Sequence, residues 1–127
     1  MLAAKAAFSG FSVDNQEKTK EFYTNTLGLT LADEKMGLTF NLPGGSGTIF
    51  AYQKDDHQPA TFTILNFVVG DINQAVDELV GKGVKFEQYE NMTDEKGIAR
   101  GIANNRGPDI AWFKDPAGNI LSVLQEK

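Results

Sequence analysis

The stretch that decides the fold is Ile110-Ala111-Trp112-Phe113-Lys114-Asp115-Pro116-Ala117-Gly118-Asn119-Ile120-Leu121-Ser122-Val123-Leu124. Two apolar runs, 110–113 and 120–124, flank a polar pentapeptide. Within it, Asp115 can accept hydrogen bonds from the backbone ahead of it, Pro116 presets the first turn dihedral, and Gly118 supplies a positive φ. Because the flanking runs are rich in aromatic and aliphatic residues, the stretch predicts a strand, a tight turn and a strand.

The first half of the chain predicts a strand, a helix and three further strands. The first strand covers 3–13, and Asp14 or Asn15 caps a helix with Glu17 in the capping-box position after Asp14. The helix continues to about Leu27, where Gly28 ends it. The three strands that follow are predicted at 29–35, 36–42 and 48–54, with a flexible hairpin loop at 43–47.

The second half repeats this order. A strand at 61–69 precedes a helix that Asp71 caps, with Gln74 in the reciprocal position. The apolar stripe of this helix is Ile72, Ala75, Val76, Leu79 and Val80. A strand at 84–89 and the closing hairpin complete the half.

The two halves match at a shift of about 56 residues, for example Phe11 with Phe67 and Val13 with Val69. One helix covers only one face of a sheet, so each half leaves an apolar face that pairing would bury or enclose. We therefore expect a single α+β domain over 1–127, with module one at 1–54, a connector at 55–60 and module two at 61–127. The two tandem strand-helix-strand-strand-strand modules have mixed sheets that are expected to form a partly open barrel around a cleft.

The segment 90–108 does not fit the repeat. It is polar, punctuated by glycine, and contains Arg100 and Arg106. Loops of this length in compact domains are usually functional or disordered, so we expect a lid or rim. Residues 98–103 could supply a short strand, which gives the fourth strand of this module a second candidate position.

Composition narrows the function. The net charge is −5, and the 12 basic residues are scattered, so a nucleic-acid partner is not expected. The acidic balance favours either cationic ligands or simply solubility. No apolar run has the length of a membrane span, no secretory signal is recognisable, and the absence of cysteine fits a cytoplasmic protein.

The doubled module with its closing Asp-Pro-x-Gly-Asn hairpin resembles the vicinal oxygen chelate superfamily, which includes glyoxalase, extradiol dioxygenases, and fosfomycin and bleomycin resistance proteins. The segments that carry the resemblance are Phe22-Tyr23 with Leu27-Gly28-Leu29, and Asp115-Pro116-Ala117-Gly118-Asn119. The resemblance covers essentially the whole chain.

In catalytic members, this resemblance implies a divalent metal held by the first and last strands of each half. The corresponding positions here are Phe8, Phe50, Ile64 and Ser122. Such a metal needs imidazole or carboxylate ligands, and shifting the alignment by one or two residues introduces none. The only histidine, His57, lies in the connector, where it is expected to be solvated. The sequence therefore predicts no metal and no cofactor.

The sequence gives little support for other catalytic arrangements. A Ser-His-Asp triad would have to rely on the lone loop histidine. The pair Glu87 and Glu90 is the only carboxylate pair suited to acid–base work, and a solvated edge is the better explanation of it.

The aromatic residues on strands are more informative. Such residues are usually core, but apolar walls with a few polar groups also describe a small-molecule pocket. We assign Asn66, Ser122 and Arg100 as orienting groups. The full predicted ligand-binding set is Phe8, Phe40, Phe50, Tyr52, Ile64, Asn66, Arg100, Trp112 and Ser122.

These observations predict a metal-independent, small-molecule-binding protein of the glyoxalase/bleomycin resistance type, with a cleft for an apolar or aromatic ligand. One alternative is a glyoxalase- or dioxygenase-like enzyme, a lyase or isomerase, with an unconventional or absent metal. A metal-free lyase or isomerase would draw on Glu87, Tyr52 or Arg100. The resemblance also suggests a homodimer, and it leaves open whether the modules pair within one chain or between two.

Overall fold

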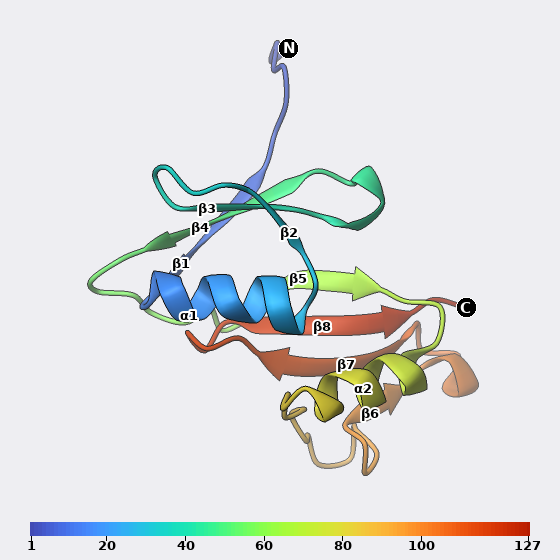
Figure 1. The fold of residues 1–127 in the computed structure, drawn as a ribbon. Helices are drawn as coiled ribbons and strands as arrows, with labels where there is room; N and C mark the ends of the chain where they lie inside the picture. Colours follow the sequence, from blue (N-terminus) through green and yellow to red (C-terminus); the bar gives the residue numbers. More distant parts are fainter. The chain divides into compact units, whose positions relative to one another are not determined.

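The computed structural model describes residues 1–127 and shows an α+β fold made of two compact units, Met1–Gln58 and Pro59–Lys127. Each unit contains one mixed four-stranded sheet and one α-helix, and neither sheet closes into a barrel (Figure 1). The boundary between the units falls inside the predicted connector at 55–60. That the chain behaves as a single domain stays a prediction.

Unit 1 builds its sheet from strands in the order β1-β4-β3-β2, with β1 and β4 parallel and the other pairs antiparallel. Its elements are β1 (Ser9–Val13), α1 (Gln16–Glu21), a π-helix (Phe22–Thr26), β2 (Thr30–Asp33), β3 (Leu38–Asn41), a 3-10 turn (Pro43–Gly45) and β4 (Thr48–Gln53). The first strand is shorter than predicted, because the exposed residues 1–8 run away from the sheet without pairing (Figure 1).

The helix of unit 1 begins as predicted and ends differently. The Asn15 side chain caps it by accepting a hydrogen bond from the Lys18 amide at 3.0 Å. Its last turn widens, because the Leu27 amide donates to the Phe22 carbonyl at 3.0 Å, five residues back. The single α-helix predicted to about Leu27 is therefore an α-helix followed by a π-helical turn. Gly28, with φ +76°, then reverses the chain.

Unit 2 has the same topology, with strand order β5-β8-β7-β6 and a parallel β5–β8 pair. Its elements are β5 (Thr63–Val68), α2 (Ile72–Gly81), β6 (Ile98–Arg100), a 3-10 turn (Ile102–Asn104), β7 (Asp109–Lys114) and β8 (Ile120–Gln125). The predicted cap of α2 is confirmed, because the Asp71 carboxylate accepts from the Gln74 amide at 3.1 Å.

The predicted strand at 84–89 is wrong. This segment makes one isolated bridge, between Phe86 and Phe113, and the Glu87 amide donates to the Trp112 carbonyl at 2.8 Å. The short β6 pairs with the neighbouring part of β7, where Ile98 lies opposite Ala111. The segments 84–89 and 98–100 therefore both pair with the same edge of β7, at different places along it.

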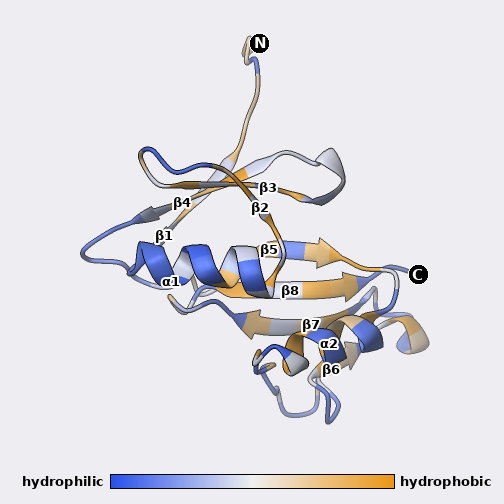
Figure 2. Cartoon of the chain, in the orientation of Figure 1, coloured by the Kyte–Doolittle hydropathy of each residue, from blue (hydrophilic) through white to orange (hydrophobic).

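Each sheet packs one face against the helix of its own unit. In unit 1 the buried Tyr23 lies 5.1 Å from Phe40 and 5.6 Å from Phe11 between ring centroids. In unit 2 the buried side chains of Ile72 and Val76 give α2 its apolar side. Burying one such side chain contributes roughly 1.5–3 kcal/mol, so these faces form the cores. Figure 2 shows the complementary pattern, with α1 hydrophilic over most of its visible surface and β8 largely hydrophobic.

The predicted β7–β8 hairpin is confirmed. The buried Asp115 carboxylate accepts from the amides of Ala117 and Asn119, both at 2.9 Å. The side-chain oxygen of Asn119 accepts from the Ala60 amide at 3.1 Å, which fastens the start of unit 2 to the turn. Gly118 has φ +85°, as the turn requires.

The helices are short, six residues for α1 and ten for α2. No helix in the structure combines the length and the hydropathy needed to cross a bilayer.

Candidate functional site

The face of each sheet that is turned away from its own helix carries most of the predicted site residues. We call it the far face. On the far face of unit 2, Asn66 lies opposite Ser122, and Ser122 lies opposite Trp112. Cross-strand partners project to the same side of a sheet, so these three side chains form one row. Residues that share this far face are Asn66, Val68, Ala99, Ile110, Trp112, Ser122 and Leu124. Ile64 lies at the irregularity of β5 between Thr63 and Leu65 and has no partner across the strands.

Ser122 and Asn66 form a polar pair within this face. The Ser122 hydroxyl is fully buried and lies 2.5 Å from Asn66 Oδ1, to which it donates a hydrogen bond. The pair therefore orients the Asn66 amide, whose NH2 group remains available as a donor. The structure brings these two predicted orienting groups together.

Trp112 forms the floor of a pocket of about 420 Å³ together with Ile110 and Ala99. The Tyr89 ring meets the indole edge to face, with centroids 5.6 Å apart and an interplanar angle of 73°, which restrains the Trp112 rotamer. The walls come from the segment 90–108 and consist of Asn91, Met92, Arg100, Gly101, Asn104, Arg106 and Pro108.

Backbone contacts hold the part of the wall at 101–108 in a defined conformation. The Arg106 amide donates to the Gly101 carbonyl at 2.9 Å, and the Ile102 amide donates to Asp109 Oδ1 at 3.0 Å. A Cβ at Gly101 would collide with the carbonyl oxygen of Pro108, so the two ends of the loop touch through their backbones. These contacts favour a fixed rim over a mobile lid.

Arg100, predicted as an orienting group, turns its guanidinium to the helix side of unit 2. It donates to Asp94 Oδ2 at 2.9 Å and to Asn73 Oδ1 at 2.8 Å, and lies 3.9 Å from Asp109 Oδ2. The structure therefore separates this charged group from the row formed by Trp112. Its role in the fold is to tie β6 to α2.

Asp94 is the centre of this cluster. Burial by itself raises the pKa of its carboxyl, but hydrogen bonds from the Ile98 amide, the Arg100 guanidinium and the Lys96 amide outweigh burial and hold the pKa below its ordinary value. Asp94 is thus kept ionised as the anchor of the segment that leads into β6.

The far face of unit 1 carries an aromatic row, which we define as Phe8, Phe50 and Tyr52. The rings of Phe50 and Tyr52 stack with centroids 5.9 Å apart, and Phe8 meets Phe50 edge to face at 6.3 Å. Phe8 precedes β1 and is 66% exposed, whereas the prediction placed it on the first strand. The structure brings these three predicted residues together.

Glycine makes room for this row. A Cβ at the buried Gly37 would lie 2.7 Å from Phe50 Cζ and 2.7 Å from the Ala51 carbonyl oxygen. Gly37 has no positive φ, so space and not backbone conformation requires glycine there. The absence of a side chain at Gly37 therefore leaves the space that the Phe50 ring occupies.

Phe40 is separated from the aromatic row. It is 0% exposed and stacks on Tyr23, on the helix side of the sheet. Its partner across β4 is Ile49, whereas Phe50 pairs with Thr39, so Phe40 and Phe50 point to opposite faces. This residue is core in the structure.

His57 is more constrained than the sequence predicted. Its Nδ1 lies 2.7 Å from the Ser12 hydroxyl, and the ring is half-buried. The Lys54 amide donates to the Val13 carbonyl, and the His57 amide donates to the Lys54 carbonyl. The connector therefore folds back along β1, which brings the imidazole to Ser12.

The positions that resemble a metal site do not fit a metal. Phe8, Phe50 and Ile64 are hydrocarbon side chains, and the Ser122 hydroxyl is engaged by Asn66. No group of three or more His, Cys, Asp or Glu side chains in the structure could hold a metal ion.

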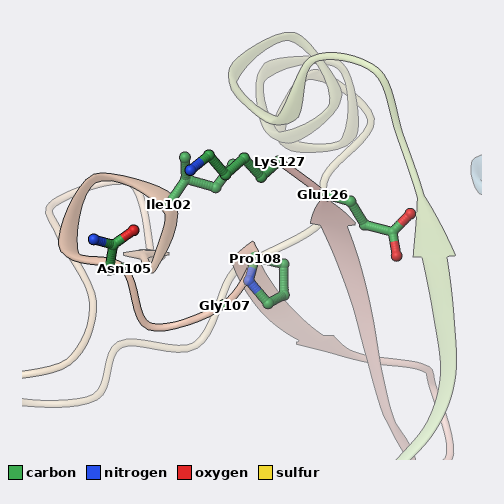
Figure 3. A pocket seen from close by; sticks show the side chains of 6 residues that line it. All are labelled: Ile102, Asn105, Gly107, Pro108, Glu126 and Lys127. Atoms are coloured by element: carbon green, nitrogen blue, oxygen red, sulfur yellow. The ribbon is translucent and has the colours of Figure 1, made fainter.

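A second pocket, of about 330 Å³, lies beside the same loop, lined by Ile102, Asn105, Gly107, Pro108, Glu126 and Lys127. Figure 3 shows the Glu126 carboxylate pointing away from the loop residues Asn105 and Pro108. This pocket has no aromatic floor, so it offers a planar ligand less than the pocket over Trp112 does.

Sequence reasoning missed part of the Trp112 pocket. Asn91 and Met92 of its lining were not assigned to the site, and Arg106 was noted only as part of the loop. The signal that could have found them was the length of the segment 90–108, since long loops beside a sheet edge often build sites.

The match to a family model identifies the fold. Residues 7–123 match the model of the Glyoxalase/Bleomycin resistance protein/Dioxygenase superfamily, and the chain belongs to this superfamily.

Solved protein structures with the same fold include members of this superfamily. An antibiotic binding protein from Streptomyces sp. CB03234 is similar over 100% of both chains, with 21% identity and a TM-score of 0.74. A member of the same superfamily from Sphaerobacter thermophilus DSM 20745 is 26% identical, with a TM-score of 0.73 over 98% of this chain and 100% of that one. A glyoxalase/bleomycin resistance protein, also from Streptomyces sp. CB03234, is 23% identical, with a TM-score of 0.63 over 94% and 100% of the chains. A comparison with curated protein sequences gives no match.

Proposed function

We propose that this protein binds a small apolar or aromatic molecule and that it does so without a metal. The observation that carries the proposal is the pocket of about 420 Å³ over Trp112 and Ile110. A preformed apolar floor with a few polar groups at its walls is the usual form of a small-molecule site. The edge-on Tyr89 ring and the fastened loop at 101–108 keep this pocket in shape without a ligand.

The aromatic row of unit 1 provides a second apolar surface. Phe50 and Tyr52 present stacked rings on the far face, and Gly37 leaves room for the Phe50 ring. Such a row suits a planar ligand because aromatic pairs gain about 0.5–1.5 kcal/mol beyond their area burial. An antibiotic binding protein shares this fold, which supports a drug-sized organic molecule as the class of ligand.

The side chains at the four expected ligand positions support metal independence. A divalent cation requires imidazole or carboxylate ligands, and Phe8, Phe50, Ile64 and Ser122 supply none. The absence of cysteine agrees with a cytoplasmic location, and resemblance to the superfamily suggests a homodimer.

A thermal-shift screen tests the proposal. Neutral aromatic compounds of drug size are added to the full chain, with and without a chelator. A ligand at about 100 times its Kd stabilises the folded state by about 2.7 kcal/mol, so a hit raises the melting temperature by several degrees. We expect hits that persist in chelator and that Trp112→Ala abolishes.

The matched control is Phe62→Ala, which also removes one exposed aromatic ring, but from a position outside the pocket. If no aromatic compound raises the melting temperature of the wild-type protein, the binding function is wrong. If chelator abolishes every hit and a divalent metal restores it, metal independence is wrong.

A further inference from the structure

The two arginines that line the Trp112 pocket are in different electrostatic states. The guanidinium of Arg100 is engaged by Asp94, Asn73 and Asp109. Arg106 lines the same pocket, yet no hydrogen bond or ion pair engages its side chain. Arg106 therefore carries a positive charge that is still available to a ligand.

No carboxylate lines this pocket. Apart from the two arginines, its polar side chains are those of Asn91 and Asn104, and the Asn104 amide group donates to the Arg100 carbonyl at 2.8 Å. Arg106 is thus the one charged side chain of the lining that no carboxylate neutralises, although the chain as a whole carries −5. Charges within hydrogen-bonding distance outweigh the distant net charge, which salt screens over about 8 Å at physiological ionic strength.

The backbone that carries Arg106 is held in place. Its amide donates to the Gly101 carbonyl at 2.9 Å, and the preceding Asn105 adopts a left-handed conformation with φ +53°. The guanidinium therefore starts from a fixed point on the rim, beside a floor formed by the only tryptophan of the chain, Trp112. A planar guanidinium can pair with a carboxylate through two parallel hydrogen bonds.

We propose that the pocket over Trp112 selects an aromatic molecule that bears one anionic group of the carboxylate class. The aromatic ring packs on Trp112 and Ile110, and the anionic group pairs with Arg106. This inference rests on the proposed binding function and reverses the sign of ligand charge that the acidic composition favours. Arg106, and not Arg100, is the residue that determines this specificity.

The test uses a matched pair of probes, 4-nitrobenzoate and the neutral 4-nitrobenzamide. Nitroaromatic rings quench indole fluorescence, and Trp112 is the sole tryptophan, so quenching reports binding at this pocket. We expect wild-type protein to bind the benzoate about fivefold more tightly than the amide, the effect of about 1 kcal/mol from one charge-assisted contact at an exposed arginine. Free N-acetyltryptophanamide corrects for collisional quenching.

The decisive variant is Arg106→Gln, which removes the charge and keeps a shorter polar side chain. We expect it to lower the affinity for the benzoate to that for the amide and to leave the amide affinity unchanged. Lys85→Gln is the control, because Lys85 is exposed and outside the pocket. It changes the net charge equally, and we expect it to retain the preference.

Three outcomes overturn the inference. If wild-type protein and Arg106→Gln bind both probes alike, the pocket binds aromatics without selecting charge, and the proposed function survives. If Lys85→Gln loses the preference as completely as Arg106→Gln, the effect is a general field and not a contact. If neither probe quenches Trp112 beyond the free indole, this pocket does not take such ligands, and only the wider thermal-shift screen decides the proposed function.

Discussion

The far faces of the two units carry different residues at equivalent positions of the repeated sheet. In unit 1 the row across the first, last and third strands is Gly10, Phe50 and Thr39, and in unit 2 it is Asn66, Ser122 and Trp112. The large ring stands on the last strand in unit 1 and on the third strand in unit 2. A repeated fold therefore keeps its backbone positions while the bulky side chain moves to a different strand.

The difference matters because of what lies beside each ring. In unit 1 the Phe50 ring has Phe8 and Tyr52 as neighbours, which together make a row of rings. In unit 2 the Trp112 ring lies beside the segment 90–108, which builds the walls of a pocket. Connecting segments tolerate change better than paired strands, so the two modules diverge most strongly there.

The largest expected effect separates the two faces of the sheet in unit 1. Phe40→Ala removes a fully buried ring that stacks on Tyr23, so we expect it to lower the free energy of unfolding by roughly 3–5 kcal/mol. Phe50→Ala removes a half-buried ring from the far face, and we expect a loss of about 1–2 kcal/mol. Urea unfolding followed by circular dichroism measures both values.

The distinction between the two faces is contradicted if Phe40→Ala and Phe50→Ala lower the free energy of unfolding equally. Phe50 would then be core, and the far face of unit 1 would not be a surface available to a ligand. A conservative variant, Phe40→Leu, serves as a control, because it keeps most of the apolar volume and should cost less than Phe40→Ala.

A smaller effect distinguishes the two closing hairpins. Asp115→Ala removes a buried carboxylate that accepts from the amides of Ala117 and Asn119, so we expect a loss of roughly 2–3 kcal/mol. Ser46→Ala removes a hydroxyl that donates to the Pro43 carbonyl in the exposed loop between β3 and β4, and we expect at most about 0.5 kcal/mol. Thermal unfolding of both variants measures the two losses of stability. A Ser46→Ala loss as large as that of Asp115→Ala would show that both hairpins hold their units together equally.

The smallest effect concerns pH and belongs to unit 2. Because the pKa of Asp94 is lower in the folded state than its ordinary value of 3.8, the ionised carboxylate stabilises the fold above that value. This contribution is lost as the pH falls from 3.8 through the folded-state pKa. We expect Asp94→Asn to cost about 1–2 kcal/mol at pH 7 and much less at pH 2.5.

Urea unfolding of the wild type and the variant across pH 2.5–7 measures the change. Asp55→Asn, at an exposed position of the connector, should leave the curve unaltered. If the wild type and Asp94→Asn differ by the same amount at every pH, the carboxylate charge of Asp94 does not stabilise unit 2.

Local sequence patterns were sufficient to predict most of the helices and strands. The spacing of Ile72, Val76 and Leu79 predicts one helical face, and Ile72 and Val76 are buried there. The Asp115 turn and its flanking strands were readable because the hydrogen bonds from the Ala117 and Asn119 amides to Asp115 lie within five residues. The segment 84–89 was misassigned, since alternation alone does not show that β6 competes with it for the edge of β7.

The candidate site was less accessible to sequence reasoning. Phe40 and Phe50 look alike in the sequence, and only the register between β3 and β4 sends them to opposite faces. Arg100 and Arg106 also look alike, and their roles separate because Asp94, Asn73 and Asp109 come together around one of them. Asn73 comes from a distant segment, and the turns between Asp94, Arg100 and Asp109 decide which of these side chains meet, so their spacing in the sequence does not reveal the contacts.

The sequence by itself determined the doubled module, the closing hairpin at Asp115 and the lack of metal ligands at four expected positions. These features follow from residue type and short-range spacing, which act before any tertiary contact forms. The tertiary structure decided which aromatic rings are core, which arginine retains an available charge, and where a pocket lies over Trp112. Those properties depend on strand register and on partners brought from distant segments, because a side chain acquires its environment only when the chain around it has folded.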